Sequence, residues 1–134
     1  MKTKSEIAVT KWDEKNCGKV NSKMVMSRAS IIYKTNGSMQ GEINVEYIIH
    51  YTNYDIKNQH NSEATYIGYM IFSGIIDGKS GTFVLEENGQ YSPIGPLSSL
   101  SIKKDTGTGE LTGISGKGSL FPENSKMFIE YELH

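Results

Sequence analysis

Short turn signals divide this sequence into hairpins, and they constrain its fold more than any other feature. Asn-Gly at residues 36–37 and Asp-Gly at residues 77–78 each separate two segments that are predicted to be strands. These dipeptides favour two-residue turns between antiparallel strands, because both positions of such a turn need positive φ angles. A further Asn-Gly at residues 88–89 predicts a third turn. With an opening strand at 5–14 and two strands near the end of the chain, the pattern predicts about eight strands.

The same sequence contains no segment with a sustained helical period. Residues 52–63 are the one polar stretch, which we predict to be a loop or a short helical turn. Long antiparallel strands must protect their edges, and closure into a barrel removes the edges altogether. We therefore predict an all-β fold, a single antiparallel eight-stranded β-barrel domain over residues 1–134. An open sandwich is the alternative.

Charge and composition argue against several classes of function. The formal net charge is −1 and Arg28 is the only arginine, whereas nucleic-acid surfaces carry a positive excess. No apolar run is long enough for a signal peptide or a membrane span, so we expect a cytoplasmic protein without a membrane partner. The histidines and the single cysteine, Cys17, lack the spacing of metal ligands. Neither a metal nor a cofactor is expected.

The tripeptide Gly-Lys-Ser at residues 78–80 resembles the end of a phosphate-binding loop. That motif needs a glycine five positions before Gly78, where the sequence has Ser73, and a helix directly after it. Here a strand is predicted to follow, so no helix terminus would face the phosphate. We interpret residues 77–78 as a hairpin turn and not as a nucleotide site.

The turns also predict which side chains face the barrel interior. A two-residue turn at 36–37 places Arg28 inward beside the apolar residues of the next strand, and it turns Glu42 and Glu46 outward. By the alternation along the later strands, Glu110 also faces inward, with Glu87 and Glu130 less well placed. The large side chains predicted to share this interior are Tyr47, Tyr66, Met70, Phe72, Phe83 and Tyr131.

A buried arginine and a buried carboxylate each need a partner, and this predicts that Arg28 and Glu110 are paired. One interpretation is a structural ion pair that braces the barrel. The other is a cavity in which Arg28 holds a ligand carboxylate, or Glu110 acts as an acid or base. The predicted ligand-binding residues are Arg28, Tyr47, Tyr66, Met70, Phe72, Phe83, Glu110 and Tyr131.

The outward face of the second hairpin is nearly as apolar as its inward face. Because a small barrel has only one interior, the extra apolar face predicts a homo-oligomer, with coverage by the terminal segments as the alternative. The residues concerned are Ile67, Tyr69, Ile71, Ile75 and Val84.

Three longer strings resemble an uncharacterised bacterial domain-of-unknown-function family of small β-barrels, grouped with allene oxide cyclase-like barrels. They are MSRASIIYKTNGSMQGEINVEY, YIGYMIFSGIIDGKSGTFVLEENGQY and GTGELTGISGKGSLFPENSKMFIEYEL, and the likeness spans about residues 11 to 133. The resemblance implies an eight-stranded, often self-associating barrel with no established activity. The positions typical of the family are Arg28, Glu42, Glu46, Gly78, Gly81, Phe83, Glu110, Gly113 and Gly116.

Because Glu42 and Glu46 belong to that pattern, a β-bulge near Gly41 that turns one of them inward is an alternative to the outward placement. Three functions follow from these observations. The first is a barrel that binds a small, largely apolar or carboxylate ligand. The second is an isomerase or cyclase-like enzyme that uses Glu110 or Glu46 with a tyrosine. The third is a filled structural barrel that acts through oligomeric assembly.

Overall fold

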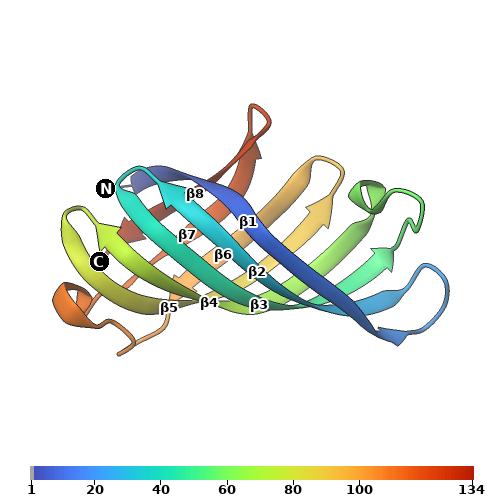
Figure 1. Ribbon diagram of the computed structural model, residues 1–134, viewed down its shortest axis with the longest axis horizontal. Helices are drawn as coiled ribbons and strands as arrows, with labels where there is room; N and C mark the ends of the chain where they lie inside the picture. The colour runs from blue at the N-terminus through green and yellow to red at the C-terminus, as the bar shows by residue number, and fades with distance from the viewer. Residues whose placement is uncertain (1) are drawn as a thin grey trace.

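The computed structural model of the protein describes residues 2–134, and eight antiparallel strands in it close into a ring (Figure 1). Each strand pairs with the next in sequence, and β8 pairs with β1, which confirms the predicted all-β barrel. Among the described residues, no helix is both long and apolar enough to span a membrane. The strands are β1 (Lys2–Lys19), β2 (Val25–Asn36), β3 (Met39–Asn53), β4 (Glu63–Ile76), β5 (Lys79–Ser92), β6 (Gly95–Ile102), β7 (Gly116–Glu123) and β8 (Lys126–Leu133), with short 3₁₀ turns η1 (Gln59–Asn61) and η2 (Gly109–Leu111).

The hairpin between β4 and β5 has the predicted turn and register. Ile76 pairs with Lys79, and the two residues between them, Asp77 and Gly78, have φ angles of 50° and 83°. Positive φ at both positions is the geometry of a type I′ turn, which matches the right-handed twist of the strands. The Gly-Lys-Ser tripeptide therefore belongs to a hairpin.

The first hairpin differs from the prediction, and the difference changes which residues of β2 face inward. Arg28 pairs with Ile48 and not with Val45, a shift of three residues. Because side chains alternate along a strand, a shift by an odd number of residues moves every side chain of β2 to the opposite face of the sheet relative to β3. The turn packs against β1, where a Cβ at Gly37 would lie 2.8 Å from Ser5 Oγ and where Met39 N–H donates to the same oxygen at 3.1 Å. This contact outweighs the local preference for a turn at 36–37.

The predicted turn at residues 88–89 is wrong, because both residues lie inside β5, which continues to Ser92. The chain turns instead at residues 93–94. Gly89 has a packing role, since a Cβ there would lie 2.5 Å from the hydroxyl of Tyr66 on the neighbouring strand. The glycine therefore makes room for a tyrosine inside the barrel.

The last hairpin turns at residues 124–125, and its register places Gly118 opposite Tyr131. Tyr131 is buried, so it lies on the inward face, as predicted.

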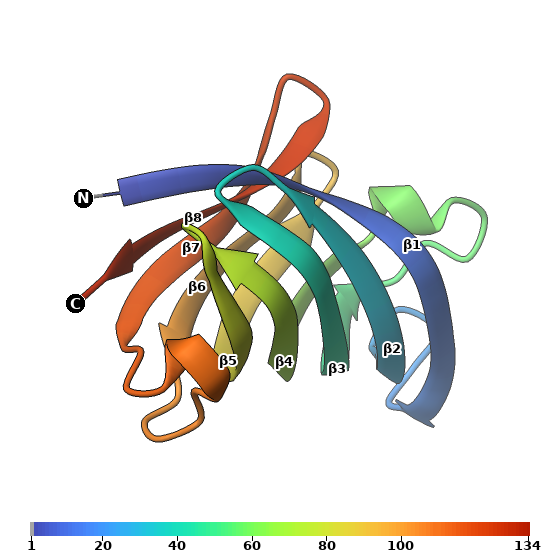
Figure 2. The ribbon, with the colours of Figure 1, turned by 60° about the vertical axis from the view of Figure 1, so that its left-hand side comes forward.

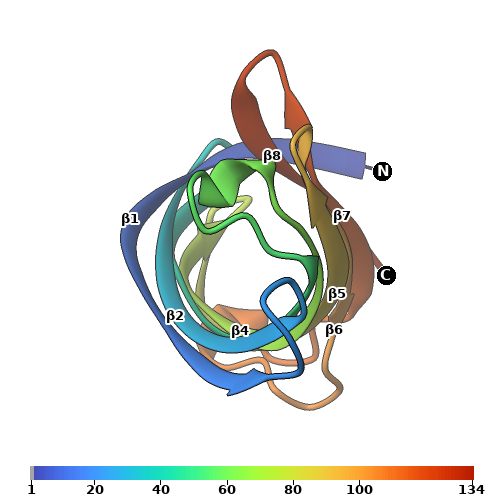
Figure 3. The same ribbon diagram turned by 90° about the vertical axis from the view of Figure 1, so that its right-hand side faces the viewer.

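The two ends of the barrel are built differently. At the end near both chain termini, the loop that carries η2 lies beneath the strands (Figures 1 and 2), and side chains such as Met70, Phe72 and Ile129 are fully buried. At the other end lie the β1–β2 loop, the segment with η1 and the hairpin turns at 93–94 and 124–125 (Figure 3). The interior opens at this end, where residues of η1 and of the two hairpin turns line the mouth of a cavity.

Candidate functional site

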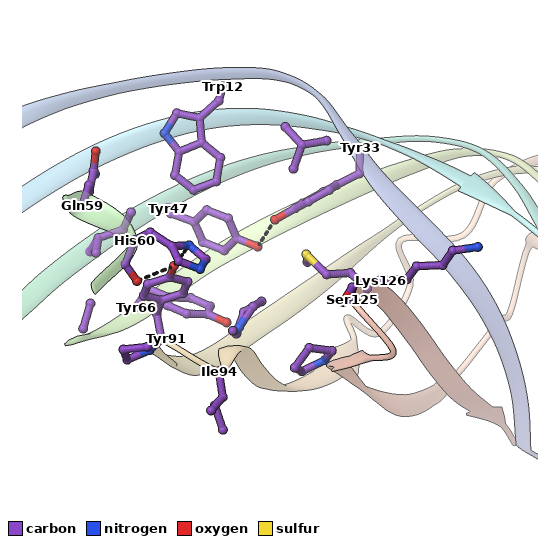
Figure 4. Close-up of a pocket in the computed structure, with 18 of the residues that line it drawn as sticks. Trp12, Tyr33, Tyr47, Gln59, His60, Tyr66, Tyr91, Ile94, Ser125 and Lys126 are labelled. Atoms are coloured by element: carbon purple, nitrogen blue, oxygen red, sulfur yellow. Dashed lines mark hydrogen bonds between the residues drawn. The ribbon is translucent and has the colours of Figure 1, made fainter. Parts of the chain in front are cut away.

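A cavity of about 960 Å³ occupies the open half of the barrel. Its volume lies in the range of small-molecule sites, roughly 300 to 1,000 Å³. Inward-facing side chains of β1 to β5 form its wall, and the loops at the mouth form its rim. The aromatic residues of the wall are Trp12, Tyr33, Tyr47, Tyr66 and Tyr91 (Figure 4), together with Tyr51.

Behind the inner end of this cavity lies a buried carboxyl group, that of Glu87 on β5. Glu87 is fully buried, because the alternation of β5 places it on the same face as Phe83 and Leu85. The Tyr47 hydroxyl donates a hydrogen bond to Oε1, whereas Oε2 has no hydrogen-bond partner among residues 2–134. Burial raises the pKa of Glu87, and the hydroxyls of Ser98 and Tyr47 offset part of that rise. Glu87 is thus an interior acid without a countercharge.

Hydroxyl groups surround this acid and connect it to the cavity. The hydroxyls of Tyr33 and Tyr47 lie 3.5 Å apart, and the Tyr66 hydroxyl is hydrogen-bonded to Ser98 Oγ. The Tyr47 and Tyr66 rings pack edge to face with centroids 5.1 Å apart. Burial is the largest cause that raises the pKa of each of the three tyrosines above its ordinary value, so all three remain neutral phenols at neutral pH. We call Tyr33, Tyr47, Tyr66, Glu87 and Ser98 the polar floor.

A second carboxylate, Glu14 on β1, lies half-buried at the mouth. It accepts hydrogen bonds from Trp12 Nε1 at 3.1 Å, from the Tyr51 hydroxyl at 2.6 Å and from Gln59 Nε2 at 3.2 Å. Gln59 belongs to η1, so these bonds hold the β3–β4 segment against β1. On the other side of the mouth, His60 Nδ1 lies 2.8 Å from the Tyr91 hydroxyl. The segment is therefore attached to strands around the opening (Figure 4).

The structure distributes the predicted interior residues over both halves of the barrel. Tyr47 and Tyr66 line the cavity. Met70, Phe72 and Phe83 are buried, but in the filled half, where the two phenylalanine rings pack 5.3 Å apart. Tyr131 is also buried near the filled end, and its hydroxyl lies 2.8 Å from Ser38 Oγ.

The predicted inward positions of Arg28 and Glu110 are wrong, and the two residues do not form a pair. Arg28 is exposed on the outer surface of β2, because the first hairpin has a different register. Glu110 is exposed in η2, since the chain there forms a loop and not an extension of β7. Its Oε1 accepts hydrogen bonds from the backbone N–H and the hydroxyl of Ser80, which lower the pKa of Glu110.

Glu42 and Glu46 are both exposed on the outer face of β3, as the turn-based register predicted. Pairing on both sides of Gly41 is regular, so the alternative of a bulge that turns one glutamate inward is wrong. The Ser30 hydroxyl donates to Glu46 Oε1 at 2.8 Å on the same surface.

Several cavity residues were not predicted as site residues. Tyr51 shares the alternation of Tyr47 and could have been included on that ground. Tyr33 becomes inward only with the observed register of β2, and Trp12 only with the register shift in β1 between Val9 and Lys11. Neither feature has a recognisable sequence signal.

Comparisons with known proteins agree with this fold and add no activity. A family model described as "Protein of unknown function (DUF3224)" matches residues 3–133. A crystal structure of a DUF3224 protein of unknown function from Shewanella oneidensis MR-1 is 21% identical and superposes with a TM-score of 0.81, over 100% of this chain and 96% of that chain. No curated protein matches. The likeness to allene oxide cyclase barrels stays a prediction.

Proposed function

We propose that the open half of the barrel binds a small, largely apolar molecule. The chain belongs to the DUF3224 family, whose function is unknown, so this proposal is based on the cavity itself. The observation that supports this proposal is the cavity of about 960 Å³, whose wall is mainly aromatic and aliphatic. Ligand sites combine such walls with a few polar groups that fix orientation, and the polar floor supplies those groups here. The filled half serves as a rigid base for the site.

A substitution that fills the cavity tests this proposal. Ala64 on β4 lines the cavity, and in Ala64→Trp the indole occupies part of its volume. We expect wild-type protein to bind an uncharged environment-sensitive dye such as Nile red, and Ala64→Trp to bind it at least about tenfold more weakly. The matched control is Thr65→Trp, whose side chain is on the outer face of the same strand. Equal dye binding by both variants would contradict the proposal.

The contact between Tyr47 and Glu87 favours a second candidate, an isomerase or cyclase-like enzyme that moves a proton. An acid with a raised pKa behind a phenol can stabilise negative charge that develops on a substrate oxygen. In this proposal protonated Glu87 donates to the Tyr47 oxygen, which leaves the Tyr47 O–H free to donate to the carbonyl oxygen of the substrate. A base from the solvent removes the proton from the neighbouring carbon and returns one to it. The test is deuterium exchange, followed by NMR, at the carbon next to the carbonyl of bound apolar ketones. The enzyme candidate requires exchange by wild type and its loss in Tyr47→Phe, and it fails if bound ketones do not exchange.

We also propose that the protein self-associates through the outer face of β4. Large apolar side chains there are well exposed, with Ile67 at 57%, Tyr69 at 54% and Ile71 at 52%. These residues alternate along one strand and are joined by Ile75, so they form a continuous apolar strip. Apolar strips of this kind are typical of contacts between subunits.

A further inference from the structure

The indole and phenol rings of the cavity wall belong to tryptophan and tyrosine, and no phenylalanine is among the described residues that line it. Phe72 and Phe83 are buried in the filled half. The faces of indole and phenol rings attract cations more strongly than the face of a phenylalanine ring does, and clusters of such rings bind substituted ammonium groups. Figure 4 shows Trp12, Tyr33, Tyr47 and Tyr66 around a common space.

Two carboxyl groups lie next to the cavity: Glu14 at the mouth and Glu87 in the polar floor. A third, Glu123, lines the rim. The basic groups are at the rim: Lys126 Nζ extends to Glu6, 3.5 Å away, and the His60 ring packs against Tyr91. Among residues 2–134, no basic side chain forms a hydrogen bond or ion pair with Glu87. An anionic ligand head at the polar floor would therefore lose its hydration without gaining a countercharge.

A cation would supply the partner that the carboxylate of Glu87 lacks. Oε2 of Glu87 is buried without a hydrogen-bond partner among the described residues, so the ionised form of this carboxyl group is disfavoured. A positive group near the polar floor would favour the ionised form. Direct contact is unnecessary, because charges attract one another over several ångströms in a protein interior, where screening by water is weak.

We propose that the cavity ligand is an organic cation, an apolar molecule whose substituted ammonium group lies among the tyrosine rings in front of Glu87. This inference rests on the proposed function, since it assigns a chemical class to the ligand of the same cavity. It replaces the carboxylate ligand expected from an inward Arg28.

Three probes built on a six-carbon chain test the proposal: hexyltrimethylammonium, hexanol and hexanoate, whose sixth carbon is the carboxylate. Trp12 is the only tryptophan and lines the cavity, so its fluorescence reports binding of all three to the intact protein. At constant pH and salt, we expect the ammonium probe to bind about tenfold more tightly than hexanol, with hexanoate the weakest. If hexanol binds as tightly as the ammonium probe, or hexanoate binds more tightly, the inference is overturned while the proposed function stands. If none of the three binds, both are overturned.

Variants of the carboxyl groups complete the test. Glu87→Gln should weaken binding of the ammonium probe at least about threefold and change hexanol binding less than about twofold, because glutamine cannot ionise in response to the ammonium group. Retained hexanol binding shows that the variant is folded. Glu46→Gln, on the outer surface, is the matched control and should bind all probes as wild type does. Equal loss of ammonium and hexanol binding in Glu87→Gln would contradict the proposed role of Glu87.

Discussion

Glu87 combines deep burial with incomplete hydrogen bonding, and this combination makes stability depend on pH. Its pKa is raised in the folded protein, whereas the unfolded chain has the ordinary value of 4.5. Between these two pKa values the folded state binds more protons than the unfolded state. The free energy of unfolding at this site therefore falls as pH rises above about 4.5, and it is constant at lower pH, where both states are protonated.

We predict that the difference in stability between Glu87→Gln and wild type shifts in favour of the variant as pH rises from 4 to 7. The shift is at most about 1.4 kcal/mol per pH unit within the window set by the raised pKa. Denaturant unfolding followed by Trp12 fluorescence measures the free energy of unfolding of each protein at each pH. The contributions of groups that titrate equally in both proteins cancel in the difference between them. A difference that does not change with pH would show that Glu87 titrates in the folded protein as it does in the unfolded chain.

The sequence predicts an individual cavity residue correctly only where it also predicts on which face of its strand that residue lies. Tyr47 and Tyr66 follow from simple alternation along β3 and β4. Arg28 was misplaced because one hairpin register shifted by three residues, and in β sheets an odd shift exchanges the two faces. Glu110 was misplaced because a strand was extended into a loop.

At the scale of elements, two glycines face each other across β3 and β4. Gly41 and Gly74 are opposite one another, and a Cβ on Gly74 would lie 2.1 Å from the carbonyl oxygen of Gln40. Two strand backbones can come this close only where neither residue has a side chain. Neither position of this pair therefore has room for a side chain.

We predict that Gly74→Ala destabilises the protein by about 1 to 3 kcal/mol, because the methyl group forces the strands apart. Gly18→Ala is the control, since a Cβ at Gly18 first meets the flexible end of Met26, at 3.3 Å. Its effect should be below about 1 kcal/mol. Thermal and denaturant unfolding of the two variants provide the comparison. Equal stability of both would contradict the role given to the glycine pair.

The position of a turn is predictable where the conformational preference of the turn residues themselves determines it, as at residues 77–78. The position is not predictable where a distant strand intervenes, as at residues 36–37, which pack against β1. The same limit applies to Asn88-Gly89, whose glycine accommodates Tyr66 and forms no turn.

At the scale of the whole molecule, the exposed strip on β4 predicts self-association. Ile71→Lys places a charge in the middle of the strip, and burying that charge in a subunit contact is costly. We expect sedimentation to show oligomers for wild type and monomers for Ile71→Lys. Ser101→Lys, on the exposed face of β6, should remain oligomeric. A wild type that stays monomeric at all concentrations would contradict the proposed contact.

Closure of the barrel could be predicted from the need to protect strand edges, and an interior cavity was one of the predicted alternatives, but which half of the barrel holds the cavity could not be predicted. Alternation along β4 is the same in both halves, with Met70 and Phe72 in the filled half and Ala64 and Tyr66 in the open one. The difference between the filled half and the open half depends on the volume of the inward side chains and on the path of β1, whose pairing with β2 shifts register twice. Bulges of this kind bend a strand without a distinctive sequence.

The most direct test of the central claim is a crystal structure of the protein grown with hexyltrimethylammonium. We predict electron density for the probe in the open half of the barrel, in contact with Trp12 and Tyr66, with its ammonium group on the side of Glu87. Density only on the outer strip of β4, or a cavity filled by rearranged side chains, would contradict the claim that this barrel binds its ligand inside.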